Sequence, residues 1–466
     1  MKRSLTAPQG AKLSKNRQHS RTMSKKGTLL RLTWVLILSA LLVPTSVSAL
    51  SLEEALDISR KQAITLQSLA AETQKAEAAH RQTAQAYLPT ISADATWLRA
   101  DSSHLTGVPV PTLALPPTLE RRDFGPAEGT LTGIQIVQPL FNADAIQSRQ
   151  SAALNVDARR HAEQWGHQAI RLEVSRRYFT LIREQQRVQA LQTAQQAAQA
   201  TARLAHANYR EGLASRLDTE QADAELAAIQ ARVAQARAKK QQAQLTLKKL
   251  LGTPSSQDDV ALSSELPTPP PPTEIDAAQE RRDLRASELA AEAASSNVKA
   301  SQAEWLPNLN LIARQQWIDG EAPLNTHGDG WLLAVNLQWT LFDGLGREGR
   351  IDESQAKARQ ARVELDDTRR RIKLEQAIAM SHWEAGWAGW HAALTAEEAA
   401  QRATRLAKRR YEEGLGSMTE LLTTQARLER ERLALINARY QGVLAGMNYY
   451  LQHGYDPLLA LEDKRP

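Results

Sequence analysis

The chain has 466 residues, no cysteine and a formal net charge of +6. Disulfides and acylation of an N-terminal cysteine are therefore excluded. Residues 1–49 hold nine Lys and Arg and no acid, which leaves 49 basic and 52 acidic residues and a net charge of −3 in the remainder. The basic character thus belongs to the N-terminal segment, and it does not indicate a nucleic-acid partner.

That N-terminal segment has the pattern of a secretory signal. Lys25 and Lys26 precede an apolar run over residues 36–43, and Val47-Ser48-Ala49 has the small-x-small form of a cleavage site. We predict a signal peptide over residues 1–49, and a start of translation at Met23 would give it a more ordinary length. An uncleaved membrane anchor is the less favoured alternative, because the run is short for a bilayer span.

The sequence contains an internal duplication. Residues 87–91 (YLPTI) return as 305–309 (WLPNL), 139–142 (PLFN) as 340–343 (TLFD), and 209–215 (YREGLAS) as 411–417 (YEEGLGS). A repeat of roughly 200 residues is too long for a solenoid unit and indicates a duplicated half-protein. We expect halves at 50–252 and 276–453, a connector at 253–275 and a tail at 454–466.

Helix formers dominate most of each half, and proline is absent from the helix interiors. The expected helices cover about 51–86, 143–208, 216–251, 276–304, 344–410 and 417–452. Two of them would be near 100 Å long at 1.5 Å per residue, which favours coiled-coil packing. A 3-4 spacing of apolar residues from Leu226 to Leu250, broken at Lys240, supports this. A plain antiparallel helix hairpin remains open as an alternative.

The connector is rich in proline, with Pro267-Thr268-Pro269-Pro270-Pro271-Pro272 at its centre. We interpret it as a stiff, extended spacer without a role of its own. Trp383, Trp387 and Trp390 fall on one helical stripe, and we expect that stripe to pack against the connector region.

Two strand pairs, at 90–138 and 308–339, interrupt the helices. Each strand has about nine residues and alternates apolar with polar side chains, which suits a tilted strand crossing a bilayer. Tryptophan at strand ends suits an interfacial girdle. The side chains expected to face the membrane are Ile91, Trp97, Ile134, Ile136, Leu309, Leu311, Trp317, Trp331, Leu333, Val335, Leu337 and Trp339. A soluble sheet also alternates, so single strands do not decide between the two environments.

The number of strands limits the assembly. Lipid requires every main-chain donor and acceptor to be paired, so a spanning barrel must close, and the smallest such barrels have eight strands. One chain supplies four. Two copies would give an interior filled by side chains, and three would give twelve strands and room for a passage. We therefore predict a mainly α fold with a small β part, internally duplicated, that forms a trimeric outer-membrane β-barrel continuous with a long periplasmic α-helical barrel.

With its two strand hairpins, two very long helices and paired Tyr-x-x-Gly turns, the chain resembles the TolC-like outer-membrane efflux factor family over nearly its whole mature length. The resemblance implies a passive homotrimeric exit duct in outer-membrane lipid, serving tripartite efflux or type I secretion. It also implies a periplasmic membrane-fusion adaptor and an inner-membrane pump of the RND, ABC or MFS type. The alternative from another class is a soluble periplasmic coiled-coil scaffold without a pore.

The resemblance further assigns the two Tyr-x-x-Gly turns to periplasmic tips that dock the adaptor. The tip residues are Gly212, Leu213, Ala214, Ser215, Gly414, Leu415, Gly416 and Ser417. Gly212, Gly414 and Gly416 would allow tight reversal, and Ser215 and Ser417 can cap the returning helices. As ordinary helix-hairpin turns they would need the same residues.

The family closes its pore with polar links at these tips, and the resemblance places Asp218, Tyr411 and Glu420 in that gate. Gly416 stands where the family can carry a gate arginine, and Thr423 where it can carry a second acid. The closed state would therefore be held differently here. The alternative for Asp218 and Glu420 is solvated charge on a helix face.

No pattern in the sequence indicates catalysis or a cofactor. The ten histidines show no metal-ligand spacing, and neither a Gly-rich phosphate loop with lysine nor Gly-x-Ser-x-Gly occurs. We expect no enzyme activity, no catalytic residue, no metal and no cofactor.

Overall fold

The computed structural model describes residues 50–100, 109–111, 119–121, 127–252, 262, 265–275, 279–320 and 328–462. The expected signal peptide lies outside these residues, as does most of the connection inside the first strand pair. The helices are α2 (Leu52–Gln62), α3 (Ile64–Gln82), α4 (Ala143–Arg210), α5 (Arg216–Leu251), α6 (Arg282–Ala303), α7 (Gly346–Glu412) and α8 (Met418–Gln452), with 3-10 turns η1 (Thr83–Ala86) and η2 (Pro457–Leu461). The strands are β1 (Thr90–Ala100), β2 (Pro109–Pro111), β3 (Leu119–Arg121), β4 (Ala127–Phe141), β5 (Asn308–Gly320) and β6 (Gly328–Gln338).

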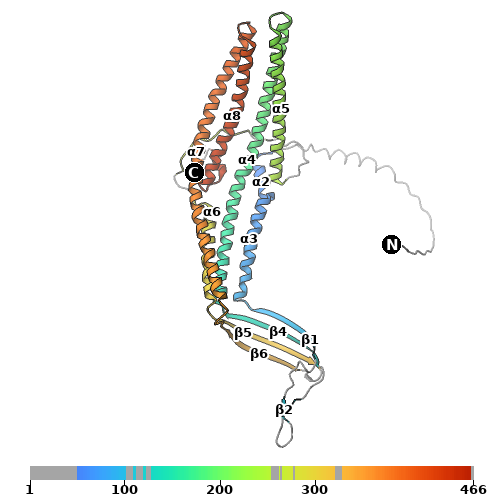
Figure 1. Ribbon diagram of the computed structural model, residues 1–466, viewed down its shortest axis with the longest axis vertical. Helices are drawn as coiled ribbons and strands as arrows, with labels where there is room; N and C mark the ends of the chain where they lie inside the picture. The colour runs from blue at the N-terminus through green and yellow to red at the C-terminus, as the bar shows by residue number, and fades with distance from the viewer. Residues whose placement is uncertain are drawn as a thin grey trace, which may run out of the picture. The chain divides into compact units, whose positions relative to one another are not determined.

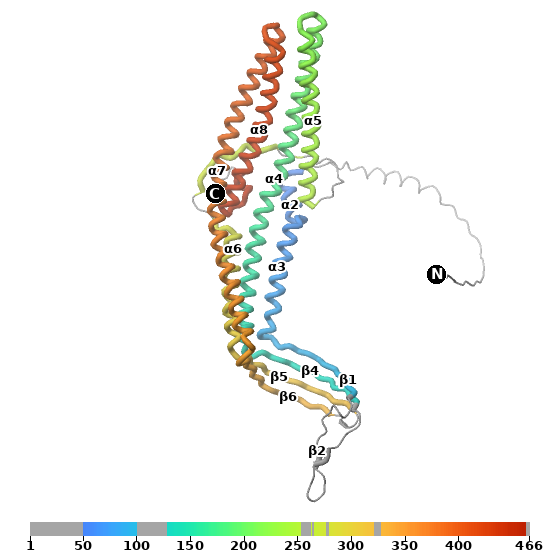
Figure 2. Tube along the Cα trace, in the orientation of Figure 1, coloured from blue at the N-terminus to red at the C-terminus, as the bar shows by residue number. Residues whose placement is uncertain are grey.

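Two helix hairpins, α4–α5 and α7–α8, lie side by side within residues 49–466, and their turns lie at the opposite end from the sheet (Figure 1). Helices α4 and α7 have 68 and 67 residues, so each is about 100 Å long. Helix α4 packs against α3, α5, α6 and α8, and α6 also packs against α7 (Figure 2). Because α4 contacts elements of both halves, it holds them together.

The α4–α5 seam follows the spacing of the sequence. Ile229, Val233 and Ala236 of α5 are buried in one cluster with Leu191 and Ala198 of α4. Alanine at the seam lets the helix axes approach closely, as expected for coiled-coil packing. Among the described residues, none of the helices combines the length and the apolar character needed to cross a bilayer.

The first expected helix, 51–86, is divided at Ala63. Ala63 has an extended conformation, with φ −62° and ψ 118°, and its N–H still donates to the carbonyl of Ser59 at 2.8 Å. Its side chain is buried, as is that of Leu66 on the next helix. The break therefore gives α2 and α3 separate directions while both keep an apolar side on α4. Nothing in local helix propensity predicts it.

Residues 265–275, the described end of the connector, contribute to the core, so the interpretation of the connector as a spacer without a role was wrong. Leu266 is fully buried, and the indole N–H of Trp383 donates to the carbonyl of Pro270 at 3.0 Å. A Cβ at Gly442 would come within 2.9 Å of Pro269, and one at Gly446 within 2.7 Å of Pro270. The two glycines of α8 therefore make room for the connector prolines.

The tryptophan stripe divides between two environments. Trp383 is buried against the connector, as expected. Trp387 instead stacks with Trp390, with ring centroids 5.3 Å apart, and with His391 at 4.5 Å. The expectation was thus correct for Trp383, while the other two indoles chiefly contact each other on α7.

The strands form one antiparallel sheet in the order β1-β4-β5-β6, and β2 and β3 form a separate two-stranded ribbon. Strands β4 and β5 come from different halves of the chain and pair from Gly129↔Gly320 to Phe141↔Leu309, with a register shift between Pro139 and Phe141. The pairing of the two halves leaves β1 and β6 as the edges of the sheet.

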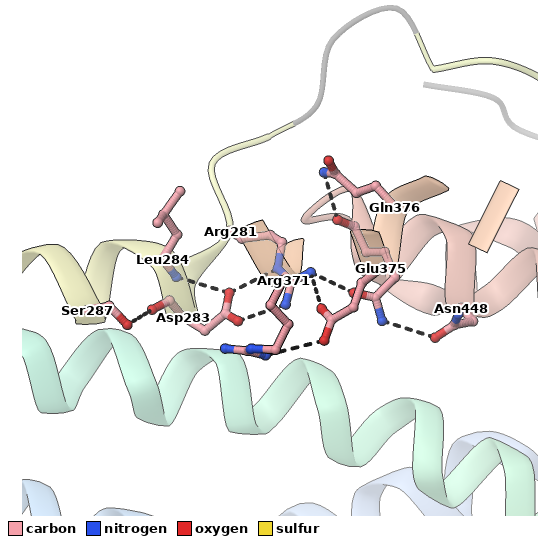
Figure 3. A network of polar contacts seen from close by, with 9 residues as sticks. Arg281, Asp283, Leu284, Ser287, Arg371, Glu375, Gln376 and Asn448 are labelled. Atoms are coloured by element: carbon pink, nitrogen blue, oxygen red, sulfur yellow. Dashed lines mark hydrogen bonds and ion pairs between the residues drawn. The ribbon is translucent and has the colours of Figure 1, made fainter. Parts of the chain in front are cut away.

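At the junction of the two halves, Arg281 precedes α6 and is only 3% exposed. Its guanidinium donates to both carboxylate oxygens of Asp283 (3.0 and 2.7 Å), to Glu375 Oε2 (2.8 Å) and to Gln452 Oε1 (2.6 Å) (Figure 3). It also lies over the Trp165 ring, 4.5 Å from the centroid. Burial acts to lower the pKa of Arg281, but the two carboxylates outweigh it and raise the pKa. One side chain thus joins α4, α6, α7 and α8.

We expect Arg281→Ala to reduce the free energy of unfolding by about 3 kcal/mol, because removing one partner of a buried ion pair leaves the carboxylates uncompensated. The loss would appear as a lower thermal unfolding midpoint of the detergent-purified protein. The control is Arg282→Ala, which removes an exposed arginine one residue along the chain. Equal midpoints for the two variants would contradict a central role for Arg281.

Candidate functional site

The strand register gathers the expected membrane-facing side chains on one face of the sheet. Ile91 pairs with Ile136, Ile136 with Ala313, and Ala313 with Leu333, so these positions share a face across all four strands. Because strands repeat every two residues, the other expected positions within the strands fall on the same face. They are Trp97, Ile134, Leu309, Leu311, Trp317, Trp331, Val335 and Leu337. Trp339 follows the end of β6, and its indole N–H donates to the carbonyl of Trp305 at 3.0 Å. Trp331 is 80% exposed, and contact of this face with lipid stays a prediction.

The opposite face of the sheet carries an ion pair that the sequence patterns did not indicate. Arg314 of β5 donates to Asp94 of β1 at 3.2 Å, across the intervening strand β4. Gly133 of β4 lies beneath this bridge, and a Cβ there would come within 3.3 Å of the Asp94 carboxylate. Glycine at this position therefore lets the two charged side chains meet over the middle strand.

The two expected tips are built alike. Gly212 and Gly414 have φ of +74° and +72°, which only glycine adopts without strain. In each turn the N–H after the glycine reaches back to close the helix, Leu213 to Asn208 at 2.8 Å and Leu415 to Arg410 at 2.7 Å. The serines begin the returning helices: Ser215 Oγ accepts from the N–H of Asp218 at 3.2 Å, and Ser417 Oγ accepts from that of Glu420 at 3.1 Å. Ala214 occupies the first turn where Gly416 occupies the second.

Gly416 has a different reason to be glycine. It is absent from the positive-φ positions, but a Cβ there would come within 3.1 Å of the Arg410 Cβ and 3.2 Å of the Tyr411 nitrogen. The expectation that Gly416 supplies chain reversal therefore needs correction, because its role is steric.

Tyr411 lies within electrostatic reach of Asp218 of the other tip. Tyr411 is buried in one apolar cluster with Ala202, Ala222 and Leu421, which come from both hairpins. Burial raises the pKa of Tyr411, and the negative charge of Asp218 raises it further. Among the described residues its hydroxyl has no hydrogen-bond partner of good geometry, although the Asn208 side chain is close enough to lower the pKa somewhat. Tyr411 is therefore a neutral, buried donor.

The carboxylates of the two tips are used differently. Asp218 accepts from the Ser215 N–H at 2.9 Å, which completes a capping box. Glu420 instead lies 3.8 Å from the Arg410 guanidinium. Arg410 also donates to the carbonyl of Leu415 at 3.2 Å. In the alignment of the two turns Arg410 corresponds to Asn208. This arginine was therefore visible in the sequence, but the sequence analysis did not identify it as the partner of Glu420. Thr423 donates to the carbonyl of Thr419 and carries no charge.

The sequence and the fold are both similar to those of known proteins. The sequence profile of the family described as "Outer membrane efflux protein" matches residues 55–253 and 275–446, in both halves. The chain belongs to this family. This outer membrane efflux protein is 27% identical to Outer membrane efflux protein BepC of Brucella suis biovar 1 (strain 1330) over 320 residues, 67% of this chain and 69% of BepC.

Solved structures show the same fold. The outer membrane protein VceC of Vibrio cholerae superposes with a TM-score of 0.74 at 18% identity, covering 87% of this chain and 96% of VceC. The CmeC outer membrane channel of Campylobacter jejuni gives 0.72 at 15% identity, covering 86% and 85%. Membership of the outer membrane efflux protein family places the protein in the outer membrane, extending into the periplasm, and does not favour the alternative of a soluble scaffold. Within the described residues no group of three or more His, Asp or Glu is arranged to hold a metal.

We expect Gly414→Ala to destabilise the second tip by about 1–2 kcal/mol, because an L-residue pays that penalty in the left-handed conformation. Hydrogen–deuterium exchange of peptides spanning residues 405–425 would be faster in the variant. Gly389→Ala is the control, since this exposed glycine lies in the interior of α7 with open space around it and alanine favours helix there. Slower or unchanged exchange in Gly414→Ala would contradict the assignment of strain to this turn.

Proposed function

We propose that three copies of this outer membrane efflux protein form a passive exit duct with a twelve-strand barrel. The observation that carries the proposal is a four-stranded sheet with one apolar face. Its edge strands, β1 and β6, are each paired on one side only within the described chain. In lipid such edges must be paired. Strand directions alternate from β1 to β6, so β6 of one copy would lie antiparallel to β1 of the next.

The space inside the closed barrel limits the number of copies. Two copies would close an eight-strand barrel, whose interior side chains fill, whereas three leave space for a passage. The Asp94–Arg314 face would then line this passage, and the tryptophan-bearing face would contact outer-membrane lipid. The related CmeC is named an outer membrane channel, which agrees with a duct.

We further propose that the tips dock a periplasmic membrane-fusion adaptor. Leu213 and Leu415 are 79% and 69% exposed at the two turns, and exposed leucines of this kind favour a protein partner. An outer-membrane duct has no access to cytoplasmic nucleotide, so energy would come from an inner-membrane pump of the RND, ABC or MFS type. The duct would thereby serve tripartite efflux or type I secretion.

We assign the pore gate to Asp218, Tyr411 and Glu420. Tyr411 is a buried donor near Asp218, and Glu420 is paired with Arg410 of the same chain. Three copies would place three such pairs around the periplasmic opening. The cation at this tip would come from Arg410, since Gly416 carries no side chain.

Leu333→Arg tests the membrane face. Leu333 is central in β6, and an arginine facing hydrocarbon at mid-depth costs about 2–4 kcal/mol per chain. We expect few membrane-inserted trimers, measured by native electrophoresis of outer-membrane extracts. The matched control is Ala334→Arg, which places the same charge on the opposite face and should leave assembly normal. Normal assembly of Leu333→Arg, or failure of both variants, would contradict the proposed orientation.

A double variant, Asp218→Ala with Glu420→Ala, tests the gate. We expect single-channel conductance in planar bilayers to rise and cation preference to fall, each by about twofold or more, because the variant removes polar links and charge at the opening. Glu413→Ala removes an exposed acid of the same tip and serves as control. Currents equal to those of the control would refute the gate residues while leaving the duct itself untouched.

A further inference from the structure

A cavity of about 520 Å³ lies between α4, α5 and α8, well away from the tips and the sheet. Arg177, Arg183, Arg187 and Lys239 line it from α4 and α5, and Asn437 lines it from α8. The volume falls in the range of small-ligand pockets. The proposed duct, docking and gate use none of these residues.

One carboxylate, Glu184, lies among these cations and is engaged through Oε1, while its buried Oε2 has no hydrogen-bond partner among the described residues. Its Oε1 accepts from Arg183 Nη2 at 2.7 Å and from Nε at 3.0 Å. Arg177, also in the lining, is paired with Glu173 at 2.6 Å. Within the part of the chain that the structure describes, Lys239 makes no ion pair and no hydrogen bond. Its charge therefore faces the cavity without a counterion.

Arg187 lines the cavity from α4. Its Nε is buried and has no hydrogen-bond partner among the described residues. Glu429 is within electrostatic reach of Arg187, but it is bound by Arg232, with the Nε–Oε1 distance 3.1 Å. Two like charges facing one cavity repel each other unless an anion lies between them.

Positive charge is concentrated in the C-terminal half of α5, which lines the cavity. Residues 216–231 hold four acids and one arginine, whereas residues 232–251 hold six cations and no acid. The helix dipole favours cations in the last turn only, so it does not account for Arg232, Arg237, Lys239 and Lys240 farther along the helix. The cavity gives Lys239 a reason to be basic.

We propose that this cavity binds a small oxyanion, carrying phosphate or carboxylate oxygens, between Arg187 and Lys239. The side-chain amides of Asn437 and Gln242, both in the lining, are neutral donors for the remaining oxygens. The bound anion would join the α4–α5 hairpin to α8. This site is independent of the gate and of the number of copies in the duct.

Thermal unfolding of the full detergent-purified protein tests the site. Inorganic phosphate and, in a second arm, citrate should raise the unfolding midpoint in a saturable way, while sodium chloride at matched ionic strength should not. Lys239→Gln should raise the dissociation constant of the anion about tenfold or more, as expected for a lost charge-assisted hydrogen bond. Lys373→Gln, which removes an exposed lysine of α7, should leave the constant within about twofold.

Selenate, a phosphate-sized oxyanion with an anomalous signal, would locate the site directly in crystals. A peak between Arg187 and Lys239 supports the proposal. Saturable stabilisation by phosphate alone or citrate alone would assign the oxyanion class. No saturable effect of either anion, equal constants for Lys239→Gln and Lys373→Gln, or selenate bound only elsewhere would each overturn it.

Discussion

A strand repeats every two residues, so a slip of one residue in any of the three pairings would turn that strand's apolar side chains to the opposite face of the sheet. The pairing of Ala313 with both Ile136 and Leu333 fixes which face is apolar. The Asp94–Arg314 bridge over Gly133 fixes the same register from the other face, because the two charges meet only where the middle strand carries no side chain. Lipid contact, closure and a polar passage all require this one register.

Several equivalent positions of the two tips carry different residues. Asn208 of the first tip corresponds to Arg410 of the second, and Ala214 corresponds to Gly416. A Cβ at Gly416 would come within 3.1 Å of the Arg410 Cβ, whereas the first turn holds Ala214 at the matching position. Asp218 accepts from the Ser215 N–H, whereas Glu420 lies beside Arg410, whose counterpart in the first turn is Asn208. The exchange of Asn208 for Arg410 thus accounts for the difference in carboxylate partner between the two tips.

Local patterns were sufficient for the strands, the helix seams and the serine caps, because each depends on neighbours within a few residues. They were insufficient where distant segments meet. The burial of the connector needs Gly442 and Gly446 of α8, some 170 residues later in the chain. The Arg281 network joins four helices, and the extended conformation at Ala63 follows from packing on α4. No periodicity within one segment contains that information, so the sequence predicted the tips better than the junction.

The junction and the tips also differ in how they treat charge. At the junction Arg281 is almost fully buried, and its carboxylate partners have fixed geometry, so the interaction resists salt and contributes to the alignment of the halves. At the tip Arg410 and Glu420 are each about half exposed and 3.8 Å apart, so solvent screens the pair and it contributes little to stability. A half-exposed pair of this kind can exchange partners at small cost, whereas breaking the buried pair leaves uncompensated charge. The same two residue types therefore form a strong buried interaction at the junction and a weak, solvent-screened one at the tip.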